Sequence, residues 1–173
     1  MFDEDEAERQ LIAETTLGPT ALWEGAAVVK AVAGGYFSAA LCANGTLLLR
    51  GMGAERREPG PWVDLAAGTY DLLLLDHQGG LHELLLREEG QPLRPLPGAA
   101  PAAFCAGFDS WRVALPEAPA QLCCGSNFAL LRRADGAVLA RGSNAWGALG
   151  RAGPHAEDWT EIPQLRGASD VAW

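Results

Sequence analysis

Basic residues are scarce in this chain of 173 residues. Lys30 is its single lysine, and 13 basic side chains stand against 22 acidic ones, which gives a formal net charge of −9. Proteins bind nucleic acids largely through Lys and Arg that displace counterions, so we do not expect direct nucleic-acid binding. The same charge disfavours contact with an anionic membrane surface. Much of the excess lies in residues 1–18, an acidic N-terminal segment that we interpret as a solvated terminus, with a partner-docking arm as the alternative.

Long hydrophobic runs are also missing. No stretch approaches the ~18–20 apolar residues needed to span a bilayer, and the acidic start lacks the basic and apolar regions of a secretory signal. The chain is nevertheless 49% hydrophobic and only 20% charged, which argues against disorder. Its 21 glycines and 11 prolines favour many turns over long helices. We therefore expect an intracellular, turn-rich, mostly β domain.

Signals for catalysis, cofactors and metals are lacking as well. The sequence has no G-x-S-x-G nucleophile elbow, no phosphate-binding G-x-x-x-x-G-K-[ST] motif and no C-x-x-C pair. His77, His82 and Glu83 could form a metal site, but turn and surface roles are favoured because no further ligand has a supporting spacing. We expect no catalytic residue, no cofactor and no metal, and a protein that is not an enzyme. All four cysteines lie in apolar stretches, where we expect buried free thiols: Cys42, Cys105, Cys123 and Cys124.

The chain does contain an internal repeat. Runs of small residues start at positions 32, 65 and 122 and end on Gly35, Gly68 and Gly125. An apolar strand, a turn and a second strand follow each run, and two of the turns contain Asn-Gly or Asp-Gly, which are strong hairpin signals. The predicted strand pairs are residues 37–41 with 46–50, 72–75 with 81–86, and 128–131 with 137–141. Residues 102–115 predict an extra strand pair inside the second unit. Repeated short-strand units of this length predict a β-propeller.

The segment after the third hairpin gives a more specific signal. Residues 142–153 read G-S-N-A-W-G-A-L-G-R-A-G, which resembles the hallmark G-x-N-x-x-G-Q-L-G-x-G of the regulator-of-chromosome-condensation repeat family. Ala148 stands in place of the family Gln, and the preceding Asp135-Gly136 matches the family's hairpin turn. The family His is absent, because its position falls on Ser38, Asp71 and Phe128 and, in the degenerate strand, on Ser110. The matching residues are Gly142, Asn144, Gly147, Leu149, Gly150 and Gly153.

These motif residues are expected to have structural roles. Glycines permit the positive φ angles and close backbone approach that a repeatedly reversing loop needs. Asn144 is expected to hydrogen-bond loop backbone groups, and Leu149 to fill the core between blades. Gly35, Gly68, Gly125, Asp135 and Gly136 complete the repeat motif.

The resemblance implies an all-β fold: about three blades of a ring that has seven blades in the family. We place the propeller repeats at residues 19–173, with blades at 32–64, 65–121 and 122–170 and a fourth repeat starting at 171. Three units cannot close a ring, so we expect further blades or a partner chain to cover open sheet edges. Of these two, a chain that continues into further blades is favoured.

By resemblance, the chain is expected to be a non-enzymatic scaffold that binds a partner protein through its loops. Candidate partners are a chromatin-modifying enzyme or another chromatin-linked factor, in the nucleus or the cytoplasm. The alternative is guanine-nucleotide exchange on a small GTPase, although no segment matches the exchange wedge of the family. Trp146 and Trp159 are the candidate partner contacts, since exposed tryptophans often anchor interfaces. The Pro-rich connector, residues 91–101, could bind an aromatic groove but is interpreted as a stiff link between blades.

Overall fold

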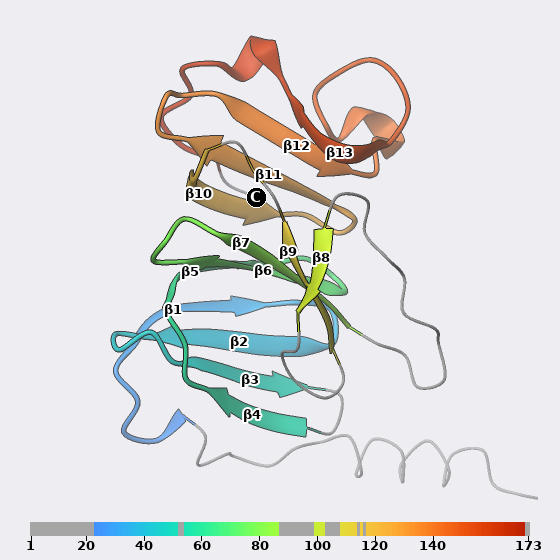
Figure 1. Ribbon diagram of the computed structural model, residues 1–173. Helices are drawn as coiled ribbons and strands as arrows, with labels where there is room; N and C mark the ends of the chain where they lie inside the picture. The colour runs from blue at the N-terminus through green and yellow to red at the C-terminus, as the bar shows by residue number, and fades with distance from the viewer. Residues whose placement is uncertain are drawn as a thin grey trace, which may run out of the picture.

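Three stacked antiparallel sheets make up the structure, a computed structural model (Figure 1). The structure describes residues 23–51, 54–86, 99–102, 108–113, 115 and 117–171. Within these ranges the chain forms thirteen strands and only short 3₁₀ turns. The acidic segment 1–18, most of the Pro-rich connector, Cys105 and Trp173 lie outside the described residues.

The first and third sheets are four-stranded meanders, in which each strand pairs with the next along the chain. The first sheet consists of β1 (Val28–Ala33), β2 (Phe37–Cys42), β3 (Leu47–Gly51) and β4 (Ala54–Glu58). The third consists of β10 (Pro119–Cys124), β11 (Phe128–Arg133), β12 (Val138–Gly142) and β13 (Ala156–Glu161). Two 3₁₀ turns flank β13: η2 (Ala145–Gly147) and η3 (Pro163–Leu165).

The second sheet has five strands, in the order β5-β6-β7-β9-β8. Its strands are β5 (Trp62–Ala67), β6 (Asp71–Asp76), β7 (Leu81–Leu86), β8 (Ala99–Ala102) and β9 (Phe108–Val113). The strand β9 takes the fourth position of the meander, and β8 pairs with its outer side. The extra strand pair expected at 102–115 is met only in part: β9 lies within this range but is the fourth strand of the meander, and β8, the one additional strand, precedes the range except for Ala102.

The hairpins follow from local turn chemistry. In the first sheet, Gly45 has a φ of +79°, and the side chain of Asn44 accepts a hydrogen bond from the backbone N–H of Thr46 at 3.1 Å. In the third sheet, Gly136 has a φ of +81°, and the side chain of Asp135 accepts from the N–H of Ala137 at 3.0 Å. Only glycine adopts such angles without cost, so these turns fix where each strand pair begins.

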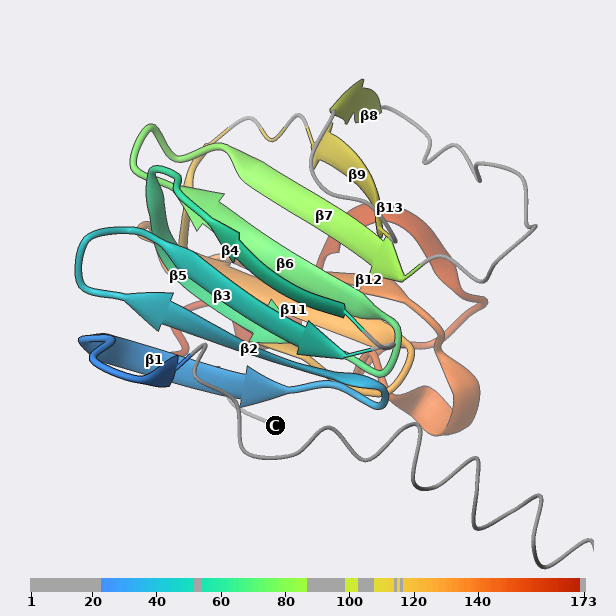
Figure 2. The same ribbon diagram turned by 90° about the horizontal axis from the view of Figure 1, so that it is seen from below.

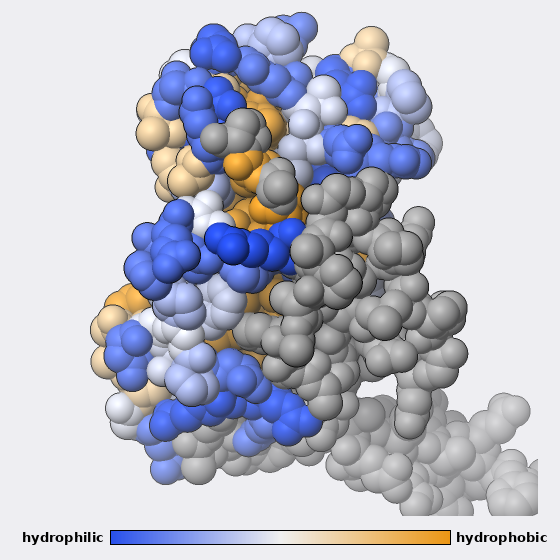
Figure 3. Space-filling model, viewed as in Figure 1, coloured by the Kyte–Doolittle hydropathy of each residue, from blue (hydrophilic) through white to orange (hydrophobic). Residues whose placement is uncertain are grey.

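Packing between the sheets comes from the two-residue alternation of the strands. Leu65, Leu72 and Leu74 face the first sheet and form one core cluster with Phe37 and its neighbours. The residues one position along the same strands, Ala66, Leu73 and Leu75, face the third sheet and belong to a second cluster. The backbones of successive sheets come closest at their first two strands (Figure 2). Figure 3 shows hydrophobic residues in the seams between layers, with hydrophilic residues around them.

The three predicted strand pairs are confirmed as β2–β3, β6–β7 and β11–β12. One position of the repeat was aligned wrongly, because the first sheet uses Gly34 where the others use Gly68 and Gly125. Each of these three glycines donates its N–H to the carbonyl three residues ahead, at distances of 2.7–2.8 Å. The position of the absent family His in the first sheet is therefore Phe37 instead of Ser38.

The expectation that open sheet edges would need covering by further blades or a partner was wrong, because the surface that such a stack leaves uncovered is a sheet face. Each described sheet keeps two edges of its own, whether or not other sheets follow, because neighbouring sheets meet face to face. What the third sheet leaves over is its outer face, and the chain itself packs on it. Leu149 and Ile162 form a cluster there with Phe128, and Val171 forms another with Cys123. Among the described residues, no helix is long and apolar enough to cross a bilayer.

Candidate interaction surface

Four loops emerge at one end of the stack, at the right in Figure 1, and we call this end the loop face. They are residues 34–36, 68–70, 125–127 and 143–155. Hydrogen bonds join them in a row. The N–H of Gly35 donates to the carbonyl of Thr69 at 3.0 Å, and the hydroxyls of Thr69 and Ser126 lie 3.0 Å apart. The N–H of Ser143 then donates to the carbonyl of Asn127 at 2.8 Å.

Glycines set the spacing of the sheets beside these loops. A Cβ added to Gly34 would lie 2.7 Å from the carbonyl oxygen of Gly68, and one added to Gly68 would lie 2.8 Å from that of Gly125. A Cβ added to Gly35 would lie 2.7 Å from the methyl carbon of Thr69. Real Cβ atoms almost never come so close to backbone, so these positions accept no side chain unless the sheets move apart.

Two exposed tyrosines lie on the loop face. Tyr36 and Tyr70 are 53% and 43% exposed, and their rings stack with centroids 5.2 Å apart. They occupy equivalent positions, two residues after Gly34 and Gly68, and Asn127 holds this position in the third sheet. The sequence did not predict this pair, although the repeated Gly-x-Tyr spacing was a usable signal once the register was known.

The hallmark loop is fastened by the side chain of Asn144. Its amide nitrogen donates to the carbonyls of Arg151 and Gly153 at 3.0 and 2.8 Å, and its oxygen accepts from the N–H of Leu149 at 3.0 Å. These are the backbone bonds expected of Asn144. The side chain of Leu149 is 1% exposed and packs on the outer face of the third sheet. Positive φ angles occur at four glycines of the motif, Gly142, Gly147, Gly150 and Gly153.

Trp146 lies at the tip of this fastened loop. It is fully exposed, and it is the one described residue other than glycine with a positive φ, with φ 61° and ψ 18°. The left-handed conformation costs a bulky residue roughly 1–2 kcal/mol. Such strain persists only where the surroundings impose it, and it concentrates at functional positions. The loop therefore holds the backbone of Trp146 in a costly conformation, with the indole ring fully exposed to solvent.

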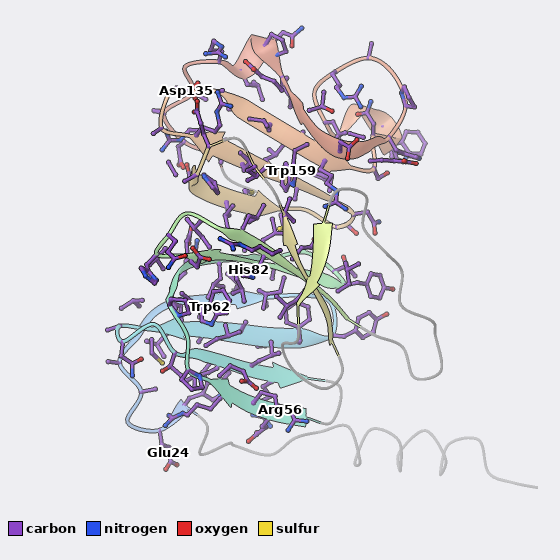
Figure 4. The ribbon with its side chains drawn as sticks, viewed as in Figure 1. Glu24, Arg56, Trp62, His82, Asp135 and Trp159 are labelled. Atoms are coloured by element: carbon purple, nitrogen blue, oxygen red, sulfur yellow. The ribbon has the colours of Figure 1, made fainter. Side chains whose placement is uncertain are left out.

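Trp159, the other candidate contact, has different surroundings. It lies on β13 (Figure 4), half-buried, and packs against the core cluster shared by the second and third sheets. Its indole Nε1 is buried and has no hydrogen-bond partner among the described residues. This arrangement gives Trp159 a packing role within the chain, and its contact with a partner stays a prediction.

A charged cluster lies in the seam between the second and third sheets. Arg141 donates a short hydrogen bond to the carboxylate of Glu83, which is 8% exposed. Burial raises the pKa of Asp71 to about 6, with a further contribution from the negative charge of Glu83. Burial also raises the pKa of Glu83, although the charge and hydrogen bond of Arg141 oppose the effect. The sequence did not predict this cluster.

The histidine group considered as a metal site does not converge. His82 lies 2.9 Å from the carboxylate of Asp76 and makes an edge contact with Trp62, with ring centroids 5.0 Å apart (Figure 4). Glu83 is the next residue of the same strand and points to the opposite face, toward Arg141. His77 is exposed at the turn. Within the described ranges no group of three potential metal ligands occurs.

The buried thiols are confirmed at three positions, Cys42, Cys123 and Cys124. Burial raises the pKa of both Cys123 and Cys124. Such thiols are poor nucleophiles, because the thiolate is the reactive form.

Comparison with known proteins identifies the fold. No family model matches the sequence, and no curated protein matches it either. Solved structures do match: human WBSCR16 with a TM-score of 0.60 and 17% identity, and Prp20p from Saccharomyces cerevisiae with a TM-score of 0.55 and 17% identity. A structure of Kap60 bound to yeast RCC1 (Prp20) matches with a TM-score of 0.57 and 15% identity. Each match covers 79% of this chain but only 37–38% of the solved chain.

These matches show a partial propeller of the regulator-of-chromosome-condensation type, as the sequence motif implied. The chain spans less than two fifths of the length of these structures, and the likeness is one of fold. Prp20p has binding properties to Gsp1p and histones, and yeast RCC1 (Prp20) is bound by Kap60.

Proposed function

We propose that the chain is a non-enzymatic protein-interaction module whose loop face binds a partner protein, with Trp146 as the principal anchor. The observation that carries this proposal is the exposed, left-handed Trp146 at the tip of a loop that Asn144 fastens. Tryptophan is enriched among residues that dominate binding energy. A loop whose backbone is already fastened loses little conformational freedom on binding.

The partner class follows from charge. With a net charge of −9, the chain is complementary to a basic protein such as a histone, which would give it a nuclear place of action. Prp20p, whose fold it shares, has binding properties to histones and to Gsp1p. A chromatin-linked partner is therefore the first class to test, and nucleotide exchange on Gsp1p is the alternative outcome.

We also propose that a fourth repeat begins at residue 171, after blades at 32–64, 65–121 and 122–170. The side-chain amide of Gln121 accepts from the N–H of Val171 at 3.2 Å and donates to its carbonyl at 2.9 Å. At the equivalent place between the first two sheets, Lys30 Nζ lies 2.6 Å from Asp64 Oδ1. Val171 thus packs on the third sheet as Leu65 packs on the first.

The test is a binding titration of the chain, as wild type and as Trp146→Ala, Trp146→Gly and Leu165→Ala, against purified core histones and against Gsp1p. Both Trp146 variants are expected to weaken binding at least tenfold. Leu165, an exposed apolar residue in η3, is the matched control and should leave binding unchanged.

Stability separates a lost anchor from a damaged fold. Trp146→Gly removes strain of roughly 1–2 kcal/mol, against an entropy cost of roughly 0.5–1 kcal/mol for glycine. Its unfolding midpoint should therefore be no lower than that of the wild type. Binding that survives both Trp146 substitutions contradicts the anchor, and a wild-type chain that binds neither protein contradicts the partner class. Faster release of labelled nucleotide from Gsp1p supports exchange instead.

A further inference from the structure

The seam between the second and third sheets carries an unbalanced set of charges. Two carboxyl groups, from Asp71 on β6 and Glu83 on β7, face a single guanidinium, from Arg141 on β12. We propose that this seam is a pH-sensitive contact, which closes more tightly in mildly acidic than in neutral solution. The proposal concerns regulation within the fold, and so it stands apart from the proposed function.

Strand geometry directs all three side chains into the seam. Each lies two residues from a leucine of the second core cluster, and side chains two residues apart share a face of a strand. Those leucines are Leu73, Leu81 and Leu139. The Asp71 carboxylate and the carbonyl of Gly125 in the third sheet both lie beside Gly68, since a Cβ added to Gly68 would clash with each of them.

The neighbours of Asp71 compensate its charge only in part, through hydrogen bonds from the backbone N–H groups of Tyr70 and Asp71 itself and through the charge of Arg141. Glu83 faces it from β7 and repels it, and Arg141 attracts it from β12 but is hydrogen-bonded to Glu83. Arg141 also donates to the backbone carbonyl of Glu157 in β13, at 2.9 Å. From β10 the cluster meets the thiol of Cys124, which is a neutral group at ordinary pH because burial raises its pKa well above the usual value. One positive charge therefore serves two acids, the half-buried Asp71 and the buried Glu83.

The other sheets hold an apolar residue where Asp71 lies. Phe37 in the first sheet and Phe128 in the third occupy the equivalent position, and both are buried in core clusters. A carboxylate at this place costs stability that phenylalanine would not. Departures of this kind from the local pattern concentrate at positions with a function beyond folding.

The direction of the effect follows from the sign of the shift. The pKa of Asp71 is raised to about 6 in the folded protein, so the folded state binds its proton more tightly than the unfolded chain does. The stability due to this proton is full below a pH of about 4 and is lost as the pH rises through about 6. The raised pKa of Glu83 acts in the same direction.

The pH-dependent tightening of the seam would also affect the order of the loop face. Asp71 follows Tyr70 directly, and Thr69 of the same loop makes its hydroxyl contact with Ser126 across this seam. Loosening the seam therefore loosens the join between the second and third loops. A partner that spans both loops would meet a better-ordered surface at lower pH.

Hydrogen exchange of the intact chain, at about pH 7.5 and about pH 5, tests the proposal, with rates corrected for the intrinsic effect of pH. Amides of β10 and β11 should open roughly tenfold less often at the lower pH, as expected for one group whose pKa rises by about two units. Asp71→Asn should remove most of this difference, leaving only the part due to Glu83. The matched control is Asp135→Asn, because Asp135 is an exposed carboxylate whose hydrogen bonds with Arg133 hold its pKa at about 2.

Three outcomes would overturn the proposal: equal opening at both pH values, a difference that stays undiminished in Asp71→Asn, or a change of equal size in β1 and β2. Direct titration of the Asp71 carboxyl carbon by NMR in the wild-type chain covers the case in which the variant does not fold. A midpoint near 6 supports the proposal, and one near 4 refutes it.

Discussion

The substitution Asn144→Ala should release the hallmark loop without touching any core side chain. It removes the amide that accepts from the N–H of Leu149 and donates to the carbonyls of Arg151 and Gly153. A net contribution of roughly 0.5–1.5 kcal/mol per hydrogen bond gives an upper range of roughly 1.5–4.5 kcal/mol for the three. Since Gly153 is exposed, its carbonyl can exchange the lost bond for water. We therefore expect a loss of about 2 kcal/mol.

The assay combines urea denaturation with hydrogen exchange at single amides. The Leu149 amide should lose protection in Asn144→Ala, while amides of the β2–β3 hairpin keep theirs. Asn144→Asp is the informative second variant. Its carboxylate still accepts from Leu149, but it replaces two donors by a negative charge beside two carbonyl oxygens, and it should be at least as destabilising as alanine. If either variant unfolds at the wild-type urea midpoint, then Asn144 does not fasten the loop.

Two further predictions concern spacing and acid. Gly68→Ala should lower the free energy of unfolding by more than Gly147→Ala. A Cβ at Gly68 would lie 2.8 Å from the carbonyl oxygen of Gly125, whereas a Cβ at Gly147 has open space and only the positive φ costs it roughly 1 kcal/mol. Equal unfolding midpoints of the two variants would contradict the close approach. At Asp76, burial disfavours the charge, but hydrogen bonds from His82 and two backbone N–H groups outweigh it and lower the pKa. The stability that Asp76 supplies should be present above a pH of about 4 and lost below it. Acid unfolding followed by circular dichroism should show a shallower loss of stability in this range for Asp76→Asn than for the wild type.

The hairpins could be predicted from the sequence because their signals are local. A turn such as Asp135-Gly136 specifies both its backbone angles and the start of the strands beside it. The outer strands β4 and β13 lacked such a signal. Their sequences, A-E-R-R-E and A-E-D-W-T-E, are mostly charged, and they become strands because β3 and β12 offer an unpaired edge.

The residues of the candidate surface could be identified only from the three-dimensional structure. The adjacent pair Gly34-Gly35 gives two alignments of equal merit in the sequence, and only the backbone pairing shows which glycine faces the next sheet. Asp71 and Arg141 are brought into one seam by the stacking of two sheets, and no periodicity of the chain encodes that meeting. Trp146 could be named as a candidate contact from the motif, but its left-handed backbone could not.

The glycine contacts between sheets have a consequence for how such chains change over generations. Gly34 meets the backbone carbonyl of Gly68, and Gly68 meets that of Gly125, so both contacts between sheets use backbone atoms that every unit possesses. A duplicated unit, or the units on either side of a deleted one, could therefore stack through the same glycine–carbonyl contact. The identity of neighbours is specified farther out, by pairs such as Lys30–Asp64 at one seam and Arg141–Glu83 at the other. The backbone contacts that join the sheets are thus separate from the side-chain pairs that distinguish one seam from another. Whole units can therefore be gained or lost while the side chains of each seam change independently.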